Sequence, residues 1–285
     1  MGRDFSPRGV GRIIDGAFDV YRANFKTIAL ASAIVLFPPA LVAGLTQVFY
    51  TRGLLELVPA LLEGDVLLEE FNRLQIWSSF ANAVSAPLYL ARIYLASALF
   101  AAAPAMLAGA RPGVREFVKG GWPRFGWLLL VSVVVSSVSG FAMLLLIVPG
   151  VYLWARLVAA PVIVVTERAP LDQALSRSWS LTAGRVWQTI GFAIAMWVFS
   201  VSLETVVDSP VLIRQLIASI DRSDALFAEL SAGWKTFEGV FAALAVSFVY
   251  PFVQLSWFHY YLDLRARREG MDLVVAAERF GDDRR

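Results

Sequence analysis

The chain has 285 residues, of which 58% are hydrophobic and 17% are charged, and its mean hydropathy is +0.64. This composition excludes an ordinary soluble protein and indicates several membrane spans. The formal net charge of +2 gives no reason to expect a nucleic-acid partner. The absence of cysteine excludes disulfides and thiolate chemistry, and the single histidine leaves almost no imidazole chemistry.

The amino-terminal segment has the pattern of an amphipathic helix. Between residues 9 and 25, apolar side chains recur every three or four positions and charged ones lie between them. We expect this helix to lie in the lipid headgroup layer, because it leads directly into an apolar run; packing beneath the membrane bundle is the alternative. Acidic residues such as Asp4 and Asp15 argue against a cleavable signal.

Six apolar segments follow, each near the roughly 20 residues with which a helix crosses a bilayer. They run from about Thr27 to Tyr50, Phe80 to Leu107, Trp127 to Val148, Val151 to Thr166, Val186 to Val207 and Phe237 to Leu262. Pro38-Pro39 predicts a kink in the first, and Val148-Pro149-Gly150 predicts the turn between the third and fourth. The predicted fold class is all-α: a polytopic membrane protein with six transmembrane helices and interfacial amphipathic helices.

Lysine and arginine residues fall mainly on one side of these spans. Eighteen lie in the amino-terminal segment, the loops after the second and fourth spans, and the tail, against five on the other side. The positive-inside rule then predicts that both termini are cytoplasmic and that the protein lies in the inner membrane. We expect residues 1–26 to form a cytoplasmic amphipathic segment, 27–262 the six-helix transmembrane domain and 263–285 a cytoplasmic tail.

The two long outer loops, residues 54–74 and 211–230, mix apolar and acidic residues. This pattern predicts short amphipathic helices on the outer face, with a solvated acidic surface on ordinary connectors as the alternative.

Three stretches at the cytoplasmic boundary are alike. Beginning at Ala17, Val114 and Leu171, each combines an amphipathic stretch, aromatic and basic residues and the start of a span. They indicate either a threefold repeat of an interfacial helix and a hairpin, or only the shared requirements of a membrane boundary.

Four stretches carry a resemblance to a known family. They are IIDGAFDVYRANF, VPGVYLWARLVAAPVIVVTE, LDQALSRSWSLTAG and YYLDLRARREGMD. In combination they resemble the glycerophosphoryl diester phosphodiesterase membrane domain family, with its uncharacterised six-span bacterial membrane proteins. The resemblance implies a six-span module, in some relatives attached to a soluble phosphodiesterase domain. These 285 residues contain no such domain, and one histidine cannot supply the histidine pair of its site, so we expect no enzyme activity, cofactor or metal.

Three charged residues within the spans are candidates for a buried charge or ligand site: Arg92, Arg156 and Glu204. Arg156 and Glu204 have similar depths on consecutive spans, which predicts an ion pair; an anionic-headgroup site and a transport pathway are the alternatives. Arg92 lies nearer the middle of the second span and needs a carboxylate, a lipid phosphate or water.

Five arginines at the cytoplasmic face form a second candidate site. Arg177 and Arg185 follow the fourth span, and Arg265, Arg267 and Arg268 follow the sixth. A positive-inside anchor with an aromatic belt is the simpler interpretation. A site for an anionic lipid or a partner protein is the sharper one.

For function, the sequence favours a non-enzymatic module that organises lipids or partner proteins, because basic segments lie at the interface and no catalytic cluster is present. Its partners would be membrane lipids, anionic ones among them, and a membrane or cytoplasmic protein. The alternative is a transporter of small solutes or lipids, in which Arg92, Arg156 and the proline interruptions line a cavity. The scarcity of midplane carboxylates for ion coupling argues against transport.

Overall fold

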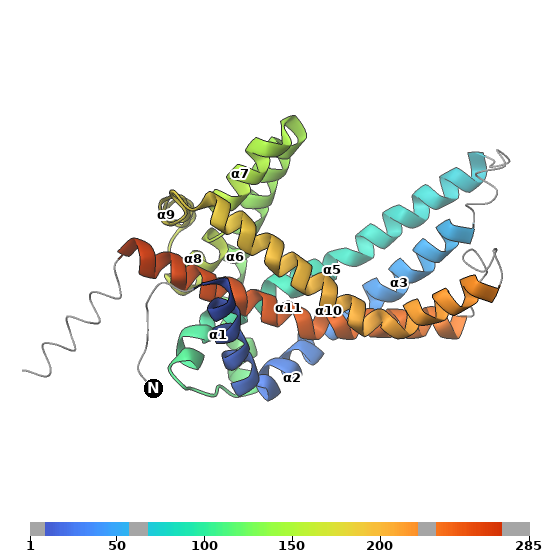
Figure 1. Ribbon diagram of the computed structural model, residues 1–285, viewed down its shortest axis with the longest axis horizontal. Coiled ribbons are helices and arrows are strands. Elements are labelled where there is room, and N and C mark those ends of the chain that lie inside the picture. The colour runs from blue at the N-terminus through green and yellow to red at the C-terminus, as the bar shows by residue number, and fades with distance from the viewer. Residues whose placement is uncertain (1–8, 57–67, 222–231, 270–285) are drawn as a thin grey trace, which may run out of the picture. The chain divides into compact units, whose positions relative to one another are not determined.

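A computed structural model describes residues 9–56, 68–221 and 232–269 of the chain, and the regular structure in these ranges is entirely α-helical (Figure 1). In chain order the helices are α1 (Val10–Ala23), α2 (Phe25–Val35), α3 (Phe37–Glu56), α5 (Leu68–Leu107), α6 (Val114–Leu145), α7 (Ile147–Leu157), α8 (Ala160–Thr166), α9 (Leu171–Leu181), α10 (Val186–Asp221) and α11 (Ala232–Glu269). The predicted all-α fold is confirmed.

Within the described residues, five helical stretches are long and apolar enough to cross a membrane. They are Ser78–Leu107, Val114–Leu145, Ile147–Thr166, Val186–Leu203 and Thr236–Glu269. A sixth is obtained when α2 and α3, which meet at an angle of 55°, are counted as one bent span. The chain is therefore a multi-pass membrane protein, and the bend lies where Pro38-Pro39 predicted a kink.

The hairpin of α6 and α7 differs from its prediction. Its turn is Leu146 alone, in an extended conformation with φ −153° and ψ 126°, so the predicted turn at Val148-Pro149-Gly150 is wrong. Pro149 fits the first turn of α7, where backbone N–H groups have no helical partner. Gly150 faces α6, and a Cβ there would lie against the backbone of Met143. The glycine serves a close helix contact rather than a turn.

The long helices also replace the predicted outer helices. α3 continues to Glu56, α5 begins at Leu68, and α10 continues without interruption to Asp221, so residues 54–56, 68–74 and 211–221 are ends of long helices. The rest of the predicted outer segments, 57–67 and 222–230, lies outside the described residues. The 36 residues of α10 correspond to about 54 Å, well beyond the roughly 30 Å of a hydrocarbon core.

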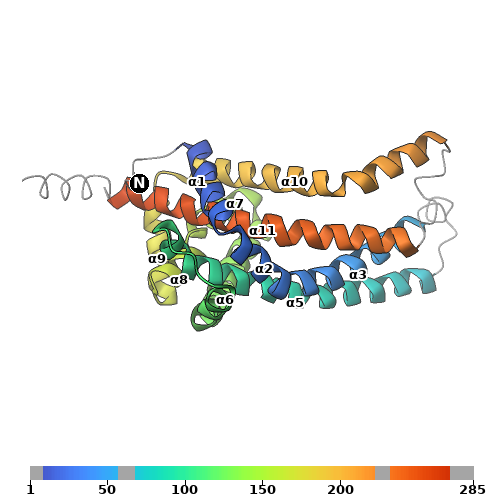
Figure 2. The same ribbon diagram turned by 90° about the horizontal axis from the view of Figure 1, so that it is seen from below.

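The chain divides into two compact units. Unit 1 contains α1, α5 from Ile93, α6 to α9, α10 up to Trp197, and α11 from Pro251. Unit 2 contains α2 from Ala29, α3, and the remaining parts of α5, α10 and α11. In unit 2, α3 runs beside α11 (Figure 2), and a Cβ on Gly44 would lie 3.0 Å from the carbonyl oxygen of Gly239. Glycines thus permit this close helix contact.

The amphipathic pattern of the amino-terminal segment is confirmed by α1, but its apolar face packs against protein. Ile13, Ala17 and Val20 are buried. Phe252 of α11 makes edge-to-face contacts with Phe18 and Tyr21, at ring-centroid distances of 6.4 and 6.0 Å. For this face of α1 the structure shows the packing that we expected only as the alternative.

Candidate functional site

A network of ion pairs joins the end of α8, α9 and the end of α11 in unit 1. Glu167, which follows α8, pairs with Arg177 of α9 and accepts a hydrogen bond from the hydroxyl of Tyr261. Arg177 also pairs with Glu269 at 2.5 Å, and Arg265 reaches the other oxygen of Glu269 at 3.1 Å. The structure therefore brings two of the five predicted cytoplasmic arginines together, but around carboxylates of the chain itself. We call Glu167, Arg177, Tyr261, Arg265 and Glu269 together the Glu167 network.

Arg177 is held in its charged form by this network. Burial of its guanidinium lowers the pKa, but the hydrogen bond and charge of Glu167, together with Glu269, outweigh burial. The pKa of Arg177 consequently lies above its usual value. An arginine already matched by two carboxylates has little attraction left for a lipid phosphate.

The other three predicted arginines do not join this network. Arg267 pairs with Asp263 at 2.6 Å, one helical turn earlier in α11. Arg185 donates to the side chain of Gln188 at 2.9 Å, and Arg268 is exposed at the end of α11. The five arginines therefore do not form one continuous binding surface within the described residues.

Arg156 lies in the last turn of α7 and is only 7% exposed. Its guanidinium carbon lies 4.2 Å from the centroid of the Trp179 ring and 6.0 Å from that of Tyr152. Its Nε atom is buried and has no hydrogen-bond partner among the described residues. The predicted partner, Glu204, has its side chain outside the described residues, so that ion pair stays a prediction. The positive charge is matched here by aromatic faces.

The backbone of Arg156 also holds α9 in place. Its carbonyl oxygen accepts hydrogen bonds from the hydroxyls of Ser178 at 2.9 Å and Thr182 at 3.1 Å. The Ser178 hydroxyl in turn accepts from the backbone N–H of Ala159 at 3.2 Å. These bonds occupy the break between α7 and α8, where helical hydrogen bonds are interrupted. They keep Trp179 over the guanidinium.

The stacking of Arg156 on Trp179 gives a measurable prediction. In a double-mutant cycle of Arg156→Met and Trp179→Leu, thermal unfolding should give a coupling energy of about 1–2 kcal/mol. This value lies between that of an exposed and that of a desolvated cation–π pair, because Arg156 is 7% and Trp179 40% exposed. Trp187, 81% exposed, provides the matched control. Arg156→Met combined with Trp187→Leu should be additive, and additivity in the Trp179 cycle would contradict the interaction.

Arg92 lies in unit 2, half-buried on α5. Its guanidinium carbon is 5.7 Å from the centroid of the Tyr250 ring, and the Tyr250 hydroxyl donates to the Arg92 carbonyl oxygen at 2.9 Å. Its Nε atom is buried without a hydrogen-bond partner in the described part of the chain. No carboxylate of the described residues pairs with it, and a lipid phosphate or water as its partner stays a prediction.

The amino-terminal part of α6 forms a further site, which is not among the predicted candidate sites. One side of it is fastened to α5 in unit 1: Tyr94 donates to the carbonyl of Val118 at 2.7 Å, and Ser97 donates to that of Gly121 at 2.8 Å. A Cβ on Gly121 would lie 2.9 Å from the backbone nitrogen of Ala98, so the two helices are in close contact. This part of α6 is therefore rigidly positioned.

A neighbouring face of the same helix is exposed and basic. Arg115, Lys119 and Trp122 follow at i, i+4 and i+7 and all three are exposed, Trp122 by 71%. We call these three residues the α6 basic face. Within the described residues neither Arg115 nor Lys119 forms an ion pair. Trp122 stacks on Phe125 with ring centroids 6.3 Å apart, and its ring also contacts that of Tyr94 at 6.2 Å. The helical spacing of the three residues was the signal in the sequence that could have identified this face.

Neither the described side chains nor known proteins identify a ligand. Within residues 9–56, 68–221 and 232–269, no three His, Asp or Glu side chains are grouped so that they could hold a metal ion. Comparisons with models of protein families, with curated proteins and with solved structures find no match. The resemblance to the glycerophosphoryl diester phosphodiesterase membrane domain family therefore stays a prediction.

Proposed function

We propose that the chain is a non-enzymatic membrane module that organises lipids or partner proteins, with anionic lipids as its first ligand. The observation that carries this proposal is the α6 basic face. Its two cations have no carboxylate partner among the described residues, and an exposed tryptophan lies one turn further along the helix. In contrast, Arg177, Arg265 and Arg267 are paired within the chain.

The chemistry of this face suits the boundary of a bilayer. An indole ring prefers the headgroup level, and each Lys or Arg near an anionic surface contributes about 1 kcal/mol of attraction. The hydroxyls of Tyr94 and Ser97 hold this helix against α5, so that little conformational freedom is lost when a lipid binds. The positive-inside rule supports a position of this face at the cytoplasmic leaflet.

To test this proposal, the protein is extracted together with its surrounding membrane, and the enrichment of anionic lipids around it is measured for each variant. Neutralising two cations, in Arg115→Gln with Lys119→Gln, should reduce the enrichment of anionic lipids by roughly an order of magnitude. Arg168→Gln with Arg268→Gln, which also removes two exposed cations but leaves α6 unchanged, should leave most of the enrichment in place. Equal losses in both variants would mean that net charge matters rather than the α6 basic face.

A transport role is the second candidate, favoured by the break between α2 and α3. Discontinuous membrane helices line substrate sites in many transporters. Flux of a solute or lipid through reconstituted vesicles that is lost in Arg92→Gln would favour transport over a static module.

A further inference from the structure

The break between α2 and α3 exposes backbone groups inside unit 2. The N–H of Leu36 still donates to the carbonyl of Ser32 at 2.8 Å. Pro38 and Pro39 have no N–H to donate, so the carbonyls four residues before them lose their helical partners. The chain bends by 55° at this point and stops packing as one continuous helix.

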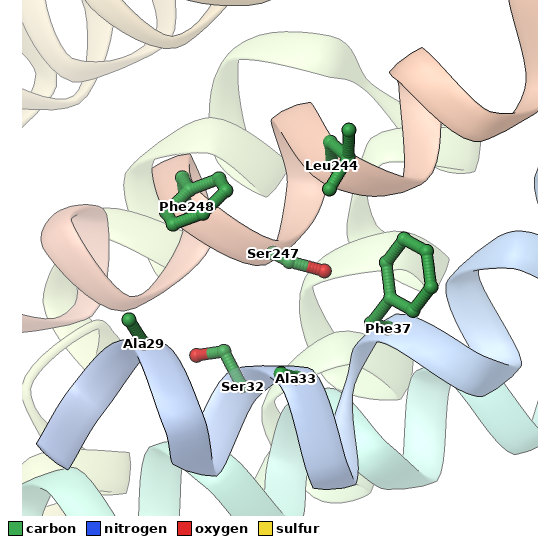
Figure 3. Close-up of a pocket in the computed structure, with 7 residues that line it drawn as sticks. All are labelled: Ala29, Ser32, Ala33, Phe37, Leu244, Ser247 and Phe248. Atoms are coloured by element: carbon green, nitrogen blue, oxygen red, sulfur yellow. The ribbon is translucent and has the colours of Figure 1, made fainter. Parts of the chain in front are cut away.

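A cavity of about 200 Å³ lies beside the break, between α2 and α11 (Figure 3). Its lining is Ala29, Ser32, Ala33, Phe37, Leu244, Ser247 and Phe248. None of these side chains is ionisable, so a charged ligand would be unpaired there. The volume corresponds to roughly six water molecules, too small for a drug-sized ligand but sufficient for a segment of an aliphatic chain.

Two hydroxyls lie in the space between the two helices, and they differ in their bonding (Figure 3). Ser247 donates to the carbonyl of Ala243 in its own helix at 2.7 Å. Ser32 is 1% exposed, and its Oγ has no hydrogen-bond partner among the described residues. A serine in a helix ordinarily bonds back to its own turn, as Ser247 does. Ser32 is thus a buried donor whose proton has no acceptor in the described part of the chain.

The cavity opens on an apolar surface. Ala33 and Phe248, which line it, are themselves exposed. On α2, the exposed neighbours Leu30 and Ile34 have exposed fractions of 44% and 63%. In a span of a membrane protein, such a surface faces lipid acyl chains. The neighbours of this opening are therefore lipids rather than solutes in water.

We propose that this cavity binds an acyl chain of a membrane lipid and that the Ser32 hydroxyl donates to the ester carbonyl at the head of that chain. The apolar lining contacts the acyl chain, and the buried Ser32 hydroxyl, which lacks an acceptor in the described part of the protein, donates to one carbonyl oxygen of the lipid. Because no charged group takes part, this site is independent in chemistry of the α6 basic face. Either proposal can fail without the other.

The experiment compares an ester-linked with an ether-linked phosphatidylcholine of equal chain length, added together to the delipidated full-length chain and counted by native mass spectrometry. The ether lipid lacks the carbonyl, so wild type should retain the ester lipid about five-fold better, the ratio that one ordinary hydrogen bond supplies. In Ser32→Ala this preference should disappear. Ala33→Phe, which places a ring at the opening, should reduce the retention of both lipids.

Ser139→Ala provides the matched control, because Ser139 of α6 is also buried, at 2% exposure, and also has no partner for its Oγ among the described residues. It should keep the five-fold preference. Equal retention of both lipids by wild type would overturn the proposal, as would a preference that persists in Ser32→Ala. If Ser32→Ala does not fold, unchanged retention in Ala33→Phe would overturn it as well.

Discussion

Gly150→Ala is expected to destabilise the protein by about 1–3 kcal/mol, the usual cost of forcing extra volume into a packed contact. The added Cβ would lie 2.5 Å from the backbone nitrogen and 2.6 Å from the Cα of Met143. Backbone atoms cannot rotate away as a side chain can, so α6 and α7 must separate. Thermal unfolding of the detergent-purified variant measures the loss.

Gly140→Ala separates this contact from the general effect of alanine in a helix. A Cβ at Gly140, also in α6, meets no atom within 4 Å. Alanine there should be neutral or stabilise the helix by about 0.5–1 kcal/mol, since glycine loses more backbone entropy on folding. A Gly150→Ala variant as stable as Gly140→Ala would contradict the close packing of the hairpin.

The spans could be predicted because they depend on one strong signal, the length of an uninterrupted apolar run. The turn at Leu146 had no such signal. An apolar residue in an extended conformation looks like any other residue of a span, whereas Pro149-Gly150 looks like a turn although its glycine serves packing. The mixture of apolar and acidic residues in 211–230 was interpreted as a separate outer helix, but charged side chains do not end a helix, and α10 continues to Asp221.

The candidate sites could be predicted only in part. Asp263 and Glu269 stand four residues from Arg267 and Arg265, a spacing that indicates ion pairs along a helix. Glu167, in contrast, is 98 residues from Arg265 in the sequence, and only the folded chain brings the two together, at 3.8 Å. Ser32 could not be predicted either, because nothing near it in the sequence indicates that its hydroxyl is buried without an acceptor among the described residues.

Glu167→Gln is expected to lower the free energy of unfolding by about 1–3 kcal/mol. The carboxylate forms an ion pair with Arg177, accepts a hydrogen bond from Tyr261 and lies 3.8 Å from Arg265. The Glu167 side chain is 20% exposed. An amide keeps the volume but removes the charge that stabilises two guanidinium groups, so the loss falls between that of a surface pair and that of a buried one. Because the network holds α9 to the end of α11, this loss should also increase cleavage by protease near α9.

A cycle with Arg177→Gln distinguishes the ion pair from a simple loss of charge. If Glu167 acts through Arg177, each single variant removes the same interaction. The loss of stability in the double variant should then be smaller than the sum of the losses in the two single variants. Glu116→Gln, at an exposed carboxylate on α6 without an ion pair among the described residues, should change stability by less than about 0.5 kcal/mol. Strict additivity of Glu167→Gln and Arg177→Gln would show that this pair does not fix α9 beside the end of α8. The position of α9 would then depend on the hydrogen bonds that Ser178 and Thr182 donate to Arg156 of α7.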